Sequence, residues 1–165
     1  SKELTLRVDA NGAFTPKSAL PILKQLSDLE VHSIEQPIQA GQVTAMSELC
    51  KQSSIGIALD EELIGIHDSE EKEALLKLIA PPFIVLKPSL HGGMNGCSEW
   101  IRLAEENQIA WWMTSALESS IGLNAIAQFT ATFEDLLPQG LGTGGLYTNN
   151  FESSLVVSKG QLRIS

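Results

Sequence analysis

Five short apolar segments recur along the chain at a nearly constant pitch, and each ends in a polar residue. The terminal residues are Asp9, Glu35, Asp60, Lys87 and Ser115. Successive ends lie 26, 25, 27 and 28 residues apart, which suits one strand, one helix and two short loops per repeat. Because the segments are almost continuously apolar, they indicate parallel strands covered by helices.

The predicted strands span residues 4–9, 33–36, 55–60, 83–87 and 109–115. Apolar residues between them recur at helical spacing. Thr15 before Pro16 is typical of a helix N-cap followed by proline in the first turn. Asp68, with Glu71 three residues later, predicts a capping box at another helix start.

Two architectures fit these repeats: an open doubly wound sheet and part of a (β/α)8 barrel. A complete barrel typically takes about 250 residues. The 165 residues here supply five βα units and a weaker sixth near Leu141. A final hairpin is predicted over residues 155–165, with its turn at Lys159 and Gly160. We therefore expect an α/β fold, and if it is a barrel, an incomplete one.

The net charge of −9 excludes the partners that require a positive surface. The chain has 20 acidic and 11 basic residues, which argues against nucleic acid and anionic membranes. Cys50 and Cys97 lie far apart with no histidine or cysteine at metal-binding spacing, so a zinc site is not expected. No apolar run is long enough to span a membrane. We expect a cytoplasmic protein with reduced thiols.

Three acidic residues at consecutive strand ends are the main indication of a site. In a parallel sheet the carboxyl ends of the strands open onto one edge, where functional groups collect. If the strands are neighbours, Asp9, Glu35 and Asp60 converge, and their mutual repulsion calls for a cation. Oxygen ligands without Cys or His favour Mg²⁺, with Mn²⁺ as an alternative. An acid at a strand end also serves often as a helix cap or a surface charge.

The next two strand ends extend this edge. Lys87 closes the run FIVLK, where burial and a nearby cation can make a lysine act as a base; alternatively, it is a surface lysine. Ser115 begins SALESS, whose later serines cap the next helix or expose amides to an anion. A glycine-rich segment around Gly144 would allow a ligand to approach the backbone.

The ordered motifs VDAN, EQP, LDE and VLKPS resemble the barrel half of the enolase superfamily, in its muconate-lactonizing-like branch. The segment TSALESSIGL is similar to the corresponding part of the o-succinylbenzoate synthases. The resemblance covers nearly the whole chain. It implies the C-terminal part of an enolase-type (β/α)8 barrel without the N-terminal capping domain.

The resemblance also assigns roles at matching positions. It implies that Asp9, Glu35 and Asp60 bind Mg²⁺, and that Lys87 is the sixth-strand lysine. That lysine stabilises a charged intermediate in the synthases and exchanges protons in the racemases. The resemblance places Asn11 near the metal in a supporting role and among the substrate-binding residues. It places Ser115 and Gly144 near the remote carboxylate of the substrate.

The implied chemistry is removal of a proton next to a carboxylate, through an enediolate that Mg²⁺ stabilises. A lyase that dehydrates its substrate in menaquinone biosynthesis is the first expectation. The alternatives are an N-succinylamino acid racemase, a dipeptide epimerase, and a non-catalytic α/β domain similar to response-regulator receivers. The eighth-strand region around Gly144 has no acid for a substrate amine, which disfavours the epimerase.

One departure from the family is severe. The second-strand Lys-x-Lys motif does not occur in this sequence. We therefore expect the chain to be the C-terminal portion of a longer enzyme and to be inactive alone. Its first strand would expose an unpaired edge, which favours self-association.

Overall fold

Five parallel strands form the central sheet of this computed structural model, which describes residues 4–164. The strands are β1 (Arg7–Asp9), β2 (Ser33–Glu35), β3 (Gly56–Leu59), β4 (Phe83–Leu86) and β5 (Ala110–Met113). They lie in chain order, and every neighbouring pair is parallel. A doubly wound sheet reverses its strand order at a switch point, whereas a barrel does not. The sequential order therefore selects the barrel architecture.

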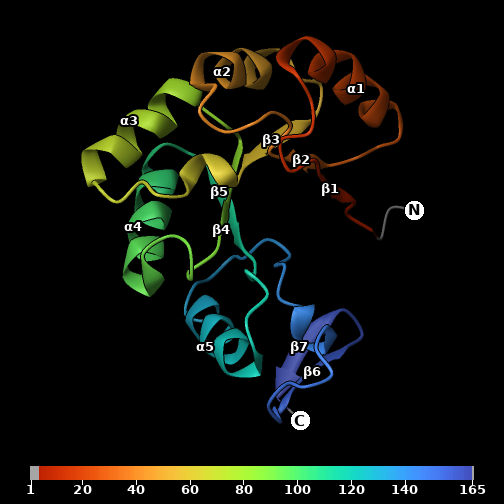
Figure 1. The fold of residues 1–165 in the computed structure, drawn as a ribbon, viewed down its shortest axis with the longest axis vertical. Coiled ribbons are helices and arrows are strands. Elements are labelled where there is room, and N and C mark those ends of the chain that lie inside the picture. The colour runs from red at the N-terminus through yellow and green to blue at the C-terminus, as the bar shows by residue number, and fades with distance from the viewer. Residues whose placement is uncertain (1–3, 165) are drawn as a thin grey trace.

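The helices cover the outer face of the sheet. They are α1 (Pro16–Asp28), α2 (Val43–Gln52), α3 (Ser69–Ile79), α4 (Gly93–Glu106) and α5 (Ser120–Thr130). Figure 1 shows α1 to α4 following one another around the outside of the curved sheet. Strand residues alternate between the faces: Ile57 and Leu59 belong to the large core beneath the helices, whereas Ala58, Val85 and Trp112 form a small cluster on the other face.

The predicted helix starts are correct in position, and one differs in detail. Thr15 caps α1 with a complete capping box, in which its partner is Ser18. Asp68 caps α3 by accepting hydrogen bonds from the backbone N–H groups of Glu70 and Glu71. The side chain of Glu71 makes no return bond to Asp68, so the capping box predicted there is only half formed.

The sixth unit predicted near Leu141 does not form a strand within residues 4–164. A single parallel bridge joins Thr114 to Gly140, and the chain then turns into the short 3-10 helix η2 (Thr143–Gly145). A Cβ atom on Gly140 would lie 2.6 Å from Oγ1 of Thr114, so this close approach requires glycine. The ladder ends there, and by Gly142, with a φ of −85° and a ψ of 13°, the backbone has left the extended conformation.

The predicted C-terminal hairpin is present. Strands β6 (Leu155–Ser158) and β7 (Gln161–Ile164) pair antiparallel, and Ser165 lies outside the described residues. Lys159 and Gly160 both have positive φ, as a two-residue hairpin turn requires. The hairpin lies beside α5 (Figure 1), with which it lines a cavity.

Both cysteines are free, and Cys97 is buried in the core. None of the helices formed by the described residues combines the length and apolar character needed to cross a membrane.

Candidate metal centre

Three carboxylates converge at the carboxyl edge of the sheet. One oxygen each of Asp9, Glu35 and Asp60 lies within 4.8 Å of the others. Asp9 and Glu35 face each other directly in the β1–β2 register. Asp60 follows β3, in which Ala58 pairs with Glu35. The predicted convergence therefore follows from the parallel register of three adjacent strands.

Three carboxylates this close together repel one another when they are ionised. Burial, with smaller effects from the charges of Asp9 and Asp60, raises the pKa of Glu35 to about 7. Burial also raises the pKa of Asp60, against the hydrogen bond and positive charge of Lys87, which lower it. Such a group gains stability from a positive charge at its centre.

The donor atoms fit a hard divalent cation. Asp60 is completely buried, and its Oδ1 has no hydrogen-bond partner. Its Oδ2 accepts a bond from Nζ of Lys87. An unpartnered buried carboxylate oxygen is costly unless a ligand occupies it. A set of three carboxylates without nitrogen or sulfur suits Mg²⁺ or Mn²⁺.

Asn11 lies beside this cluster and contacts Asp9 and a nearby fourth acid, Glu61. Its Nδ2 donates to Oδ2 of Asp9 at 2.9 Å and to Oε1 of Glu61 at 3.2 Å. Its backbone N–H donates to Oδ1 of Asp9 at 2.8 Å. Asn11 has a φ of 43°, a conformation that asparagine tolerates better than most residues. The residue therefore orients Asp9, and a contact with substrate remains a prediction.

Two contacts hold Lys87, one through its side chain and one through its backbone. Its ammonium group contacts Asp60, and its side chain is 17% exposed. Its backbone N–H donates to Nδ1 of His91 at 2.9 Å. His91 is buried, and burial, with smaller effects from Lys87 and Lys72, lowers its pKa to about 4. Neutral His91 thus acts as an acceptor that fixes the end of β4.

Ser115 contacts Thr143, the residue that directly precedes Gly144. Oγ of Ser115 lies 2.6 Å from Oγ1 of Thr143, and it accepts a bond from the amide of Leu117 at 3.2 Å. Within residues 4–164, no hydrogen bond or ion pair joins Ser115 or Gly144 to the three carboxylates. Their placement near a substrate remains a prediction.

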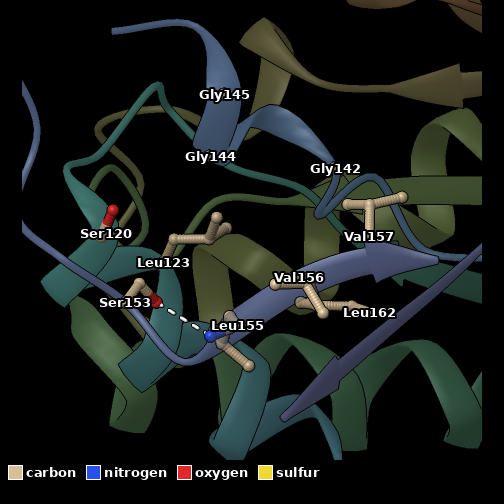
Figure 2. Close-up of a pocket in the computed structure, with 10 residues that line it drawn as sticks. All are labelled: Ser120, Leu123, Gly142, Gly144, Gly145, Ser153, Leu155, Val156, Val157 and Leu162. Carbon is tan, nitrogen blue, oxygen red and sulfur yellow. Dashed lines mark hydrogen bonds between the residues drawn. The ribbon is translucent and has the colours of Figure 1, made fainter. Parts of the chain in front are cut away.

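Gly144 lines a cavity of about 390 Å³ between α5 and the hairpin, shown in Figure 2. Ser120 and Leu123 of α5 face the glycines of η2 across this cavity. The amide of Ser120 is already occupied, because it donates to Oδ1 of Asn150 at 2.8 Å. Ser119 occupies the N-cap position without a side-chain bond. The start of α5 is therefore capped by a residue distant in sequence, and this amide is not free for an anion.

Sequence reasoning missed the residues that support the cluster. His91 is assigned no role from the sequence, although its position four residues after Lys87 suits a turn that returns to the strand end. Gln36 stands in the motif EQP and received no role, yet it is completely buried beside the acids. Its polar side chain next to a proline was the available signal.

Comparison with known proteins agrees with this fold. The family model described as "Enolase C-terminal domain-like" matches residues 1–165. An o-succinylbenzoate synthase from Desulfotalea psychrophila is 54% identical over 164 residues, which are 99% of this chain and 44% of that protein. An N-succinylamino acid racemase from Thermus thermophilus is 33% identical over 120 residues, 73% of this chain and 31% of that protein.

The crystal structure of MenC from Desulfotalea psychrophila superposes with a TM-score of 0.93 at 55% identity. The match covers 96% of this chain and 44% of that structure. The fold is thus the C-terminal part of an enolase-type barrel, as predicted. The chain spans less than half the length of these relatives.

Proposed function

The chain belongs to the enolase superfamily, and we propose that it is the barrel portion of an o-succinylbenzoate synthase, a lyase that dehydrates its substrate. One observation carries the reaction class: Lys87 contacts Asp60, whose second oxygen is buried and unpartnered within a cluster of three carboxylates. The 54% identity to a synthase supports the choice of substrate within that class.

The residues would divide the work as follows. Asp9, Glu35 and Asp60 would hold Mg²⁺, or Mn²⁺ in its place. When bound, the cation would supply positive charge to the substrate carboxylate and to the negative charge that develops beside it. Lys87 would place its ammonium group against the same region, where it stabilises that charge electrostatically. Asn11 would keep both oxygens of Asp9 oriented.

Abstraction of the proton is assigned to a group outside residues 1–165. The family uses a second-strand Lys-x-Lys motif, which this sequence does not contain. We therefore treat residues 1–165 as a partial barrel domain that needs a preceding segment for turnover. Ser115 and Gly144 would contact the remote carboxylate of the substrate, and menaquinone biosynthesis would be the pathway served.

A chimera tests the proposal. Residues 1–165 replace the matching 44% of the Desulfotalea psychrophila synthase, and the intact synthase serves as the positive control. We expect Mg²⁺-dependent dehydration of the synthase's cyclohexadiene substrate, which is monitored by ultraviolet absorbance. Turnover should be lost in Lys87→Ala and retained in the surface variant Lys51→Ala, whose ammonium is exposed.

Two outcomes would overturn the assignment. A folded chimera that binds Mn²⁺ but racemises N-succinylamino acids without dehydration would make the chain part of a racemase. A folded chimera that binds no divalent cation would remove the enolase-type chemistry altogether and leave a binding domain.

Self-association is a separate proposal. Within residues 4–164, β1 pairs only with β2, so its other edge offers unpaired backbone groups. Light scattering of the 165-residue chain should give a mass above that of one chain. A monomer at every concentration would show that the edge is protected in another way.

A further inference from the structure

We propose that Gln36 is a positioning residue, which locks the loop after β2 to the loop after β3 and so sets the spacing of Glu35 and Asp60. The inference rests on the proposed metal site and adds a residue to it. Gln36 directly follows Glu35 and is completely buried.

The carbonyl end of the Gln36 side chain holds the β3 loop. Its Oε1 accepts a hydrogen bond from the backbone N–H of Asp60 at 3.1 Å and another from Glu62 at 3.3 Å. Both donors lie just past the end of β3, where no neighbouring strand pairs with them. Without this oxygen the two amides would lose their acceptor in a buried region.

The amide end of the same side chain bonds to both loops. Its Nε2 donates to the carbonyl of Ile38 at 3.0 Å and to Oε2 of Glu62 at 3.2 Å. The other oxygen of Glu62 accepts from the amide of Gly41 at 2.9 Å. All four hydrogen-bonding positions of the Gln36 amide are therefore used: three bonds cross to the loop after β3, and the one to Ile38 stays within the loop after β2.

The backbone of Gln36 is also committed to this arrangement. Its N–H continues the β2–β3 ladder by donating to the carbonyl of Ala58 at 2.9 Å. Its φ of 34° is unusual for a residue other than glycine. A rare backbone conformation persists where the surroundings determine it, and such positions cluster at functional sites.

The hydrogen bonds of Gln36 should affect the affinity for the cation as well as the stability of the fold. The oxygens of Asp60 reach the cluster only if the backbone at residue 60 is held at its present position relative to Glu35. Partners that orient metal ligands typically account for about 10- to 100-fold in affinity. Gln36 is uncharged, so its effect on the site must come through geometry.

Two substitutions separate geometry from charge. Gln36→Met keeps the size of the side chain but removes all four bonds. Gln36→Glu keeps the shape, yet an ionised carboxylate cannot donate to Ile38 or Glu62. It also adds a negative charge near the cation, which by electrostatics alone would tighten binding. Gln128→Glu, which adds the same charge on the exposed face of α5, is the matched control.

The measurement is Mn²⁺ affinity of the 165-residue chain by electron paramagnetic resonance, with the folded fraction checked by circular dichroism. We expect about 10-fold or greater weakening in Gln36→Met and weakening in Gln36→Glu despite its added charge. Gln128→Glu should bind like the wild type.

The inference is overturned if Gln36→Met binds Mn²⁺ as the wild type does, or if Gln36→Glu binds more tightly. Should Gln36→Met fail to fold, the direction of the change in Gln36→Glu decides alone. A folded wild-type chain that binds no Mn²⁺ would overturn the proposed metal site itself, and the positioning role with it.

Discussion

Proton competition at Glu35 should make metal binding strongly dependent on pH. Burial and the neighbouring acids raise the pKa of Glu35 to about 7, compared with an ordinary value of 4.5. A cation binds the ionised carboxylate, so protons and metal compete for the same oxygen. Because the pKa of Glu35 is raised, the affinity for the cation should be highest well above pH 7 and should fall as the pH drops through 7.

The magnitude follows from the fraction of Glu35 that is ionised. With a pKa of about 7, that fraction falls from about nine tenths at pH 8 to about one tenth at pH 6. The association constant should therefore fall about tenfold over this interval, which corresponds to about 1.4 kcal/mol. An ordinary glutamate would remain ionised throughout and leave the affinity nearly unchanged.

Calorimetric titration of the chain with Mn²⁺ at pH 6, 7 and 8 measures the effect. Repeating the pH 6 titration in buffers of different ionisation enthalpy counts the protons released, and about one per cation is expected. The Glu35→Gln variant should bind weakly and without this pH dependence. An affinity that changes less than twofold between pH 8 and pH 6 would refute the reasoning about Glu35.

Three further predictions concern stability. Burial lowers the pKa of His91 from 6.5 to about 4. The free energy of unfolding should therefore be highest above pH 6.5 and should decrease by about 3 kcal/mol as the pH falls toward 4. Urea unfolding across that range should therefore show a steeper acid loss for the wild type than for His91→Asn. Gly96→Ala should destabilise by about 2 kcal/mol or more, because its Cβ would lie 1.9 Å from the carbonyl oxygen of His91. Gly142→Ala, with open space around it, should change the melting temperature little. Thr15→Ala should lose about 1 kcal/mol with the capping box of α1, while Thr15→Ser should retain most of it in the same melting assay.

The βα repeat and the polar strand ends could be predicted from the sequence because they are local. The period of apolar residues and the capping signal at Thr15 depend on neighbours within one or two turns. Parallel pairing then places the residues that end consecutive strands at one edge. The convergence of Asp9, Glu35 and Asp60 followed from that rule without knowledge of any side-chain contact.

The ends of the chain's regular elements were less predictable. The β5 ladder continues only as one bridge to Gly140, although a sixth unit was predicted near Leu141. Whether a short segment joins a sheet depends on the tertiary contacts around it. Here Gly140 packs closely against Thr114, and the chain then turns into η2. The cap of α5 by Asn150 spans 30 residues and has no local signal.

The sequence by itself determined the βα order of this protein, the acids at its strand ends and its family. Only the tertiary structure decided how those acids are held. Three bonds of Gln36 join two loops that α2 and β3 separate in the chain, and the buried ring of His91 accepts a bond from the end of β4. Burial raises the pKa of Glu35 and lowers that of His91, and this burial exists only in the folded chain. The periodicity of the sequence therefore predicts which side chains can lie close together. Tertiary packing determines their hydrogen-bond partners, their exposure to solvent and their charge.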